Sequence, residues 1–226
     1  GIKDCIGDII QIQFTEVFDY TNTINLENNH RLDDIVYTLE SDYNNEEIVP
    51  FESYTTKVYL EEDDKTIQVQ IFDARDIRNV ISLRERRSGD ELRIEDEGVV
   101  ISEKFAKNNN IKVGDVITIE SEAGIKGDVE VLGITEIYFQ HYLFMSFETY
   151  ENVFNENVHC NSIAVKSKNS SDLVNKMKDY DTVVSIVDFG PMISNFTKRE
   201  SRLEYSETAS FKYFSFNFPT QITVIF

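Results

Sequence analysis

Helix-type and strand-type patterns alternate through the first third of the chain. Apolar side chains recur at every third or fourth position over residues 2–13 and again over 32–39, which predicts two amphipathic helices. β-branched residues favour a strand over 16–26, and apolar residues alternate with polar ones over 66–72. Residues 48–60 also have a strand-like composition. This part of the chain is therefore predicted to contain helix, strand, helix and two further strands in that order.

The most regular patterning lies between Gly98 and Phe147. Short apolar runs there are separated by turn residues such as Asn108-Asn109-Asn110 and Glu122-Ala123-Gly124. Ser102 is a favourable N-cap residue for the helix that should follow it. Four short strands packed around one helix predict a small β-rich lobe. The strands are predicted at 98–101, 116–120, 128–138 and 143–147, and the helix at 103–108.

Strands and helices alternate again after this segment. A strand over 162–166, a helix over 171–177 and a strand over 182–187 form a second strand–helix–strand unit. Gly190-Pro191 then predicts the start of a last helix, because proline is favoured in a first turn. We therefore predict an α+β fold in which two strand–helix–strand units form a porter-like α/β base. Residues 1–97 and 148–204 make up this discontinuous base, and residues 98–147 form the inserted small β-rich lobe.

The last stretch, residues 205–226, departs from this pattern. It is rich in aromatic residues and almost uncharged, and it is too short and too polar in its first half to span a bilayer. An alternating run such as Phe214, Phe216 and Phe218 could instead add to a sheet edge. We expect this tail to be foreign to the domain, or to be a stub that leads towards a membrane span. No apolar run elsewhere suits a membrane span or a signal peptide. We therefore expect this chain to be a fragment whose targeting information lies outside the given sequence.

The charge of the chain is strongly negative, because 22 Lys and Arg residues stand against 41 Asp and Glu residues, which gives −19. Such a surface repels phosphate backbones, which argues against nucleic-acid binding, and it disfavours anionic lipid headgroups. It suits a cationic peptide or Ca²⁺ as a ligand, or it serves solubility alone. The acidic run Glu61–Asp64 lacks the spacing and glycine of a Ca²⁺ loop, which favours a solvated turn. The basic cluster Arg84–Arg87 could form a binding patch, but the acids interleaved with it favour a self-paired connecting loop.

The common motifs for catalysis, nucleotide binding and metal binding are missing from the sequence. Cys5 and Cys160 could form a disulfide outside the cell, but Cys5 lies on an apolar helix face, which favours a buried thiol. Asp73 and Asp188 both end predicted strands, a position where aspartate commonly serves a turn. We therefore expect no enzyme activity, no cofactor and no metal ion.

An aromatic run near the end of the inserted lobe is the best candidate for a contact surface. It surrounds one of the three histidines of the chain. Such a cluster fits contact with a partner or substrate, or it forms the core and rim of the lobe. The candidate contact residues are Tyr138, Phe139, His141, Tyr142 and Phe144.

A series of short motifs runs through most of the chain: Gly1-Ile2-Lys3-Asp4-Cys5-Ile6, Ser88-Gly89, Gly98-Val99-Val100-Ile101-Ser102-Glu103-Lys104, Lys112-Val113-Gly114-Asp115, Gly133-Ile134-Thr135-Glu136, His141-Tyr142-Leu143-Phe144-Met145-Ser146 and Tyr150-Glu151-Asn152-Val153-Phe154. Their order and spacing resemble the extracytoplasmic domain of the FtsX-like ABC transporter permeases, also called the MacB-like core domain. The resemblance extends from Gly1 to about Leu203, and each motif alone is weak. Cys5 stands where the resemblance predicts serine, which weakens the disulfide further.

The resemblance implies a non-catalytic part of a membrane transporter. The permease would pair with a cytoplasmic ATPase subunit, and ATP-driven closure would move this domain on the extracellular face of the cell membrane. The partner outside would be a peptide, a lipoprotein or a cell-wall protein. Many Asn, Lys, Glu and Ile residues, with few Pro and Gly, fit an AT-rich, Gram-positive source.

Two other functions remain open from the sequence. The first is a free-standing extracellular binding or sensor module for cationic peptides, which the negative charge favours. The second is an acid-dependent hydrolase, which requires two carboxylates in one cleft.

Overall fold

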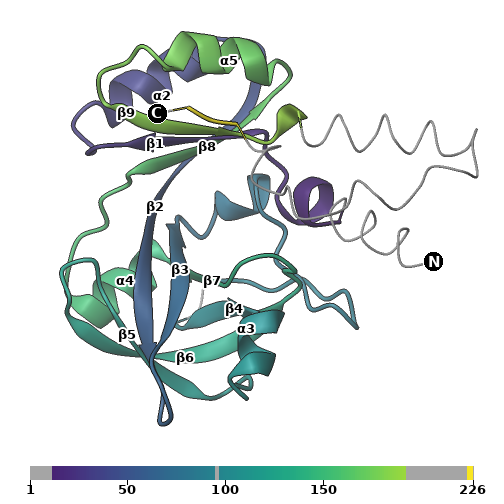
Figure 1. Cartoon of the computed structure of the whole chain (residues 1–226), viewed down its shortest axis with the longest axis vertical. Coiled ribbons are helices and arrows are strands. Elements are labelled where there is room, and N and C mark those ends of the chain that lie inside the picture. The colour runs from purple at the N-terminus through teal and green to yellow at the C-terminus, as the bar shows by residue number, and fades with distance from the viewer. Residues whose placement is uncertain (1–11, 95–96, 192–222, 226) are drawn as a thin grey trace, which may run out of the picture.

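The computed structural model describes residues 12–94, 97–191 and 223–225 (Figure 1). Most of the predicted first helix, Cys5, the helix predicted after Gly190 and most of the tail lie outside these residues. None of the described helices is long and apolar enough to cross a membrane. The described part is a mixed α+β fold of two lobes that share one long strand.

The first lobe is an antiparallel sheet covered by two helices, and we call it the helix-covered lobe. Its strand order is β10-β9-β1-β8-β2. Ile24, Ile163 and Ile186 on the strands pack against Ile35 and Leu173 on the helices. The amphipathic spacing that predicted both helices therefore places their apolar faces on this sheet. The elements are β1 (Asn22–Leu26), α2 (Leu32–Glu40), the first half of β2 (Asn45–Tyr59), β8 (Ser162–Ser167), α5 (Ser170–Met177), β9 (Val183–Asp188) and β10 (Thr223–Ile225).

The second lobe is a closed barrel, and we call it the barrel lobe (lower half of Figure 1). Its strand order is β2-β3-β7-β4-β6-β5, and β5 pairs with β2 again, with Val58 opposite Ile119, which closes the barrel. The pairs β3–β7 and β4–β6 are parallel, so the sheet is mixed. The elements are the second half of β2, β3 (Lys65–Phe72), η2 (Ile77–Asn79), β4 (Val99–Ser102), α3 (Glu103–Asn108), β5 (Val116–Glu120), β6 (Lys126–Thr135), β7 (Tyr142–Ser146) and α4 (Phe147–Phe154).

Strand β2 belongs to both lobes, and its buried positions change parity where it passes from one lobe to the other. Residues 45–51 pair with β8, and residues 52–58 pair with β3. Phe51 is buried in the first half, whereas Tyr54 is buried in the second. Successive residues face opposite sides of a strand, so this shift turns the other face of β2 inward. Glu52 is the buried residue at the switch.

Strand pairing joins the predicted inserted lobe to strands outside it. β7 pairs with β3 and β5 pairs with β2, so the barrel combines residues 52–72 with residues 99–146. The predicted boundary between the base and the inserted lobe, at residues 97 and 98, therefore places strands of one barrel in two different units. The division of the chain into a base and an inserted lobe stays a prediction.

The strand predicted over 16–26 is wrong in its first half. Ile12–Val17 forms a π-helix, η1, and β1 begins only at Asn22. Val17 and Phe18 are buried in an apolar cluster between the lobes, and this packing overrides their strand propensity.

One helix is missing from the prediction, and the capping of another differs from it. Helix α4 follows β7 at a position where no helix is predicted, and the Ser146 hydroxyl caps it by accepting a hydrogen bond from the Thr149 N–H at 3.0 Å. Ser102 precedes α3 as predicted, but its side chain makes no capping hydrogen bond. The Ser102 hydroxyl instead accepts from the Tyr142 N–H at 3.1 Å, which links β4 to β7.

The described part of the tail is β10. Thr223–Ile225 pairs antiparallel with residues 186–188 of β9. The alternating run from Phe214 to Phe218 lies outside the described residues.

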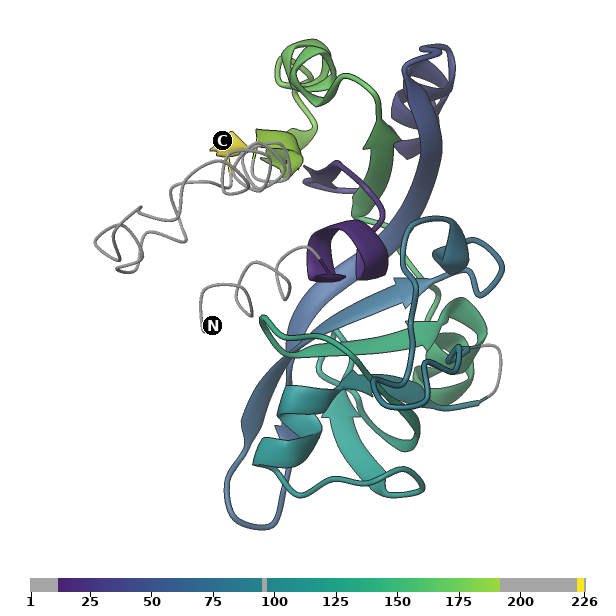
Figure 2. The same cartoon turned by 90° about the vertical axis from the view of Figure 1, so that its right-hand side faces the viewer.

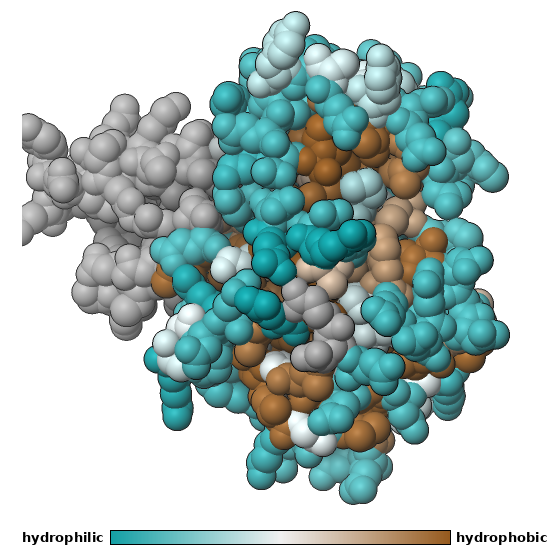
Figure 3. Space-filling view, turned by 180° about the vertical axis from the view of Figure 1, so that it is seen from behind, coloured by the Kyte–Doolittle hydropathy of each residue, from teal (hydrophilic) through white to brown (hydrophobic). Residues whose placement is uncertain are grey.

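Apolar clusters fill the barrel, the space under the helices and the space between the lobes. The interlobe cluster joins Phe51 and Ala164 of the helix-covered lobe to Phe72 and Phe144 of the barrel lobe, and it includes Phe18. Phe51 and Phe72 stack with their ring centroids 4.6 Å apart. Figure 2 shows η1 between the two lobes, and Figure 3 shows apolar surface on both lobes with hydrophilic surface around it.

Candidate functional site

The predicted aromatic run does not form one exposed face. Phe144 on β7 is 0% exposed and belongs to the interlobe cluster. Tyr138, Phe139, His141 and Tyr142 are partly buried. Contact of these four side chains with a partner stays a prediction.

Rings from separate segments meet in what we call the aromatic junction. Phe14 of η1 lies 5.5 Å from Phe189 and 6.5 Å from Phe139, measured between ring centroids. Phe18 lies 5.6 Å from Tyr142 in the same way. Such ring pairs contribute about 0.5–1.5 kcal/mol each beyond the area that they bury. The aromatic junction therefore ties η1 and the end of β9 to the loop before β7. Its members are Phe14, Phe18, Tyr20, Phe139, Tyr142 and Phe189.

The side-chain amide of Gln13 fastens η1 to the same loop. Gln13 is 2% exposed. Its Oε1 accepts hydrogen bonds from the Tyr138 N–H at 2.9 Å and the Phe139 N–H at 2.8 Å. Its Nε2 donates to the Phe139 carbonyl at 3.4 Å. If this amide were removed, the Tyr138 and Phe139 N–H groups would lose the oxygen to which they donate. One unsatisfied buried donor costs about 1–3 kcal/mol of stability.

Arg84 joins the same elements through two ion pairs. Its Nη2 lies 2.8 Å from the Glu16 carboxylate of η1, and its Nε lies 2.9 Å from the Glu136 carboxylate. Arg86 pairs with Glu103 of α3 at 3.1 Å. The prediction of a self-paired basic loop is wrong for these two arginines, because their partners lie outside the loop. The loop therefore connects η1 with the barrel lobe.

His141 lies apart from the aromatic junction, against α3. Its ring meets the ring of Phe105 edge-on at 5.4 Å between centroids. Its Nδ1 is buried and has no hydrogen-bond partner. Burial, and then the charge of Lys104, lower the pKa of His141 below its ordinary value, which favours the neutral imidazole. The His141 ring packs against α3, away from the aromatic junction.

The lobes are also joined where two segments of the chain pass from one lobe to the other side by side. These segments are residues 51–53 of β2 and residues 159–161 before β8, and we call them the strand crossing. The Asn161 side chain pairs with both backbone groups of Ser53. Its Oδ1 accepts from the Ser53 N–H at 2.9 Å, and its Nδ2 donates to the Ser53 carbonyl at 3.0 Å. The Asn161 N–H donates to the Phe51 carbonyl at 3.2 Å. A side-chain amide thus takes the place of a backbone partner.

Glu52 is a buried carboxylate at the strand crossing. It is 2% exposed and accepts a hydrogen bond from the His159 N–H. Burial raises the pKa of Glu52 to about 7, the like charges of Glu122 and Glu156 also raise it, and the His159 hydrogen bond opposes them. Glu52 therefore changes its protonation near neutral pH. Burial, together with Glu52, also raises the pKa of Cys160 to about 11, which keeps this thiol protonated.

The contacts above hold segments of the chain together, and the described residues offer few groups suited to catalysis. No group of three or more His, Cys, Asp or Glu side chains among them could hold a metal ion. Asp73 pairs with Arg75 at 2.8 Å, whereas Asp188 is buried and accepts from the Gly190 N–H at 2.9 Å. The two carboxylates lie after the end of β3 and at the end of β9 and have separate partners, whereas a hydrolase would need them together.

Three residues of these contacts are missing from the sequence-based candidates. Gln13 is a polar position on an otherwise apolar helix face, and Glu52 lies where the buried positions of β2 change parity. Both signals are visible in the sequence. Asn161 carries no such signal, because its partner Ser53 is 108 residues away.

The family described as MacB-like periplasmic core domain matches residues 3–179 of the chain. No curated protein matches it. Among solved structures, the chain is similar to the extracellular domain of YknZ, a noncanonic ABC-type transporter from Gram-positive bacteria. The sequence identity is 13%, the TM-score is 0.44, and the match covers 70% of this chain and 88% of that one. It is also similar to the periplasmic region of MacB from Actinobacillus actinomycetemcomitans, with 14% identity, a TM-score of 0.45, and coverage of 89% and 100%. The family match confirms the resemblance drawn from the sequence motifs.

Proposed function

Because the chain belongs to the family of MacB-like periplasmic core domains, we propose that it carries the movement of an ATP-driven permease across the membrane without catalysing a reaction. It is an extracytoplasmic domain of a MacB/FtsX-like ABC transporter. The proposed partners are a cytoplasmic ATPase subunit, reached through the rest of the permease, and a peptide, lipoprotein or cell-wall protein outside. The proposed location is the extracellular face of a Gram-positive cell membrane.

The contact between Phe14 and Phe189 carries this proposal. Phe14 directly follows the helix predicted over residues 2–13, and Phe189 directly precedes the helix predicted to start at Gly190-Pro191. Their ring centroids are 5.5 Å apart, and the Phe189 N–H donates to the Thr21 carbonyl at 2.8 Å. A domain held between two membrane spans needs the segments that lead into it and out of it to lie together. This contact therefore supports a mechanical link to the membrane part.

The interlobe cluster supports movement of the two lobes as one body. Phe51, Phe72 and Phe144 are each at most 2% exposed, and they come from both lobes. A large apolar interface opposes independent movement of the units that share it. Gln13 and Arg84 attach η1 to the barrel lobe, so a displacement of η1 would move the barrel as well.

The proposal is tested in the whole permease with its ATPase, using probes at Tyr43 in the helix-covered lobe and Val113 in the barrel lobe. These side chains are 95% and 59% exposed, so labels there leave the core intact. Cys5 and Cys160 are replaced by Ser to direct the labels. We expect ATP to change the distance from Tyr43 to the membrane surface, while the distance between Tyr43 and Val113 stays constant. If the distance from Tyr43 to the membrane does not change with ATP, the proposed coupling is wrong. If the distance between Tyr43 and Val113 changes, the lobes do not move as one body.

Two arginine variants sharpen this test. Arg84→Gln removes the ion pair with Glu16 of η1, and we expect it to reduce the ATP-driven change at Tyr43. Arg93→Gln is the matched control, because Arg93 pairs with Glu91 at 3.6 Å within the same loop and has no ion pair with η1. Equal responses of the two variants would show that Arg84 plays no part in the transmission.

A further inference from the structure

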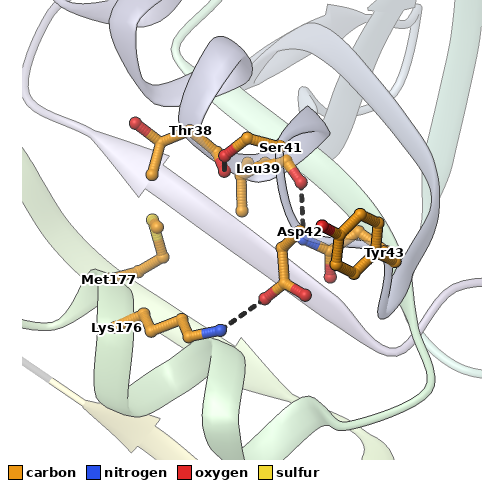
Figure 4. A pocket seen from close by; sticks show the side chains of 8 residues that line it. Thr38, Leu39, Ser41, Asp42, Tyr43, Lys176 and Met177 are labelled. Carbon is orange, nitrogen blue, oxygen red and sulfur yellow. Dashed lines mark hydrogen bonds and ion pairs between the residues drawn. The ribbon is translucent and has the colours of Figure 1, made fainter.

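A cleft of about 350 Å³ lies between the ends of α2 and α5 in the helix-covered lobe (Figure 4). Leu39 and Met177 line it and are buried, so its inner wall is apolar. Tyr43 lines its edge and is 95% exposed. The volume is at the small end of ligand pockets, which suits one or two side chains of a partner.

The polar groups of this cleft favour a positively charged donor. Helix α2 ends at Glu40 and helix α5 ends at Met177, and the C-terminus of a helix carries a partial negative charge. The carboxylate of Asp42 also lines the cleft. The Asn45 Nδ2 donates to the Leu39 carbonyl at 2.9 Å, which orients the amide and leaves the buried Oδ1 without a partner. The unpaired group of the cleft is thus an acceptor.

Lys176 demonstrates that this cleft accommodates an ammonium group. It reaches across from α5, and its Nζ lies 2.5 Å from the Asp42 carboxylate (Figure 4). The same Nζ lies 2.7 Å from the Asp172 carboxylate. These hydrogen bonds, first with Asp172 and then with Asp42, raise the pKa of Lys176 to about 12. The Lys176 side chain is 48% exposed, so a cation from outside can compete with it for Asp42.

We propose that this cleft binds a basic segment of a partner polypeptide. The stem of one Lys or Arg side chain lies on Leu39 and Met177, and its charged head lies between Asp42 and the ring of Tyr43. Such side chains bury an apolar stem while the charge stays near water, and a cation over a tyrosine ring gains a cation–π contact. The charge of −19 attracts such a segment over a longer range. This site goes beyond the proposed coupling function, which needs no ligand in the cleft.

The probe for this site is the peptide acetyl-Leu-Arg-Leu-Arg-amide, titrated by calorimetry into the full 226-residue chain. The reversed-charge peptide acetyl-Leu-Glu-Leu-Glu-amide should not bind. Tyr43→Ala should weaken binding by about 2- to 5-fold, the size of an exposed cation–π contact. Tyr37→Ala is the matched control, since Tyr37 is 74% exposed on α2 but does not line the cleft. Absence of heat with the arginine peptide, or equal weakening by both variants, would overturn the proposal.

A second pair of variants separates this site from diffuse attraction to a negative chain. Asp42→Asn and Asp63→Asn remove the same charge, and both aspartates pair with a lysine, Asp63 with Lys65 at 2.9 Å. We expect only Asp42→Asn to weaken binding. Lys176→Gln removes the competing ammonium and should tighten binding. Equal effects of the two aspartate variants, or weaker binding by Lys176→Gln, would also overturn the proposal. Neither result would affect the proposed coupling function, because that function depends on the aromatic junction.

Discussion

The aromatic junction and the strand crossing join the same two lobes, but they do so with different chemistry. The aromatic junction gathers phenylalanine and tyrosine rings around η1, and the Gln13 amide fastens η1 beside it. The strand crossing consists of backbone groups, the amide of Asn161 and the carboxylate of Glu52. Apolar burial is non-directional and carries no proton, whereas the carboxylate of Glu52 titrates. The junction should therefore stabilise the fold equally between pH 5 and pH 8, where burial keeps Tyr20 and Tyr142 protonated, while the crossing should make stability depend on pH in this range.

The largest effect is expected for Phe18→Ala in the aromatic junction. Phe18 is 4% exposed and packs against Tyr20 and Tyr142, so its removal leaves a cavity between the lobes. We expect the free energy of unfolding to fall by about 3–5 kcal/mol, measured by urea denaturation. The loss should be equal at pH 5 and pH 8. Tyr37→Ala is the control at an exposed ring and should change stability by less than about 0.5 kcal/mol. A Phe18→Ala loss that varies with pH would contradict the comparison.

The next effect is expected for Glu52→Gln at the strand crossing. The folded pKa of Glu52 is raised from 4.5 to about 7, so between these values the folded chain holds a proton that the unfolded chain releases. The stability of the unmodified chain therefore falls as pH rises from about 4.5 to about 7 and then levels off. One pKa unit corresponds to about 1.4 kcal/mol, so the loss is about 3.5 kcal/mol at most. Glu52→Gln should remove this loss and be the more stable chain at pH 8.

Glu156→Gln serves as the control for this pH dependence. The charge of Glu156 helps to raise the pKa of Glu52, so its removal should shift the fall in stability to lower pH without abolishing it. Denaturation curves collected from pH 4 to pH 9 provide the measurement. An unchanged slope in Glu52→Gln would show that another group causes the pH dependence.

The sequence predicts the regular elements well where one face of the element is buried. The helix predicted over 32–39 is observed at Leu32–Glu40, and the strand predicted over 116–120 is observed at those residues. The apolar periodicity of both elements reports one buried face directly. The signals for α4 are also present, since Ser146 caps the helix and Tyr150 and Phe154 are buried on it, but the prediction leaves this helix out.

The contacts between the lobes are harder to predict, because they join residues far apart in the chain. Gln13 meets Phe139 across 126 positions, and Asn161 meets Ser53 across 108. Local periodicity contains no information about such pairs. The aromatic run was predicted from composition, which identifies Phe139 and Tyr142 as notable but does not reveal that their rings face η1 and Phe18.

The smallest effects are expected for the two amides, and they test whether the aromatic junction and the strand crossing are independent. Gln13→Ala and Asn161→Ala should each lower the free energy of unfolding by about 1–3 kcal/mol, because Gln13 bonds three backbone groups and Asn161 bonds both backbone groups of Ser53. Gln13→Ala should cost more, since Gln13 is 2% exposed and water reaches the partly buried Asn161 more easily. Gln13→Glu keeps an acceptor for both N–H groups and should recover part of the loss. The two alanine effects should add within about 0.5 kcal/mol in the double variant if the contacts are separate. A coupling above about 1 kcal/mol would mean that the junction and the crossing open as one unit, and the contrast between them would then describe their chemistry but not their roles.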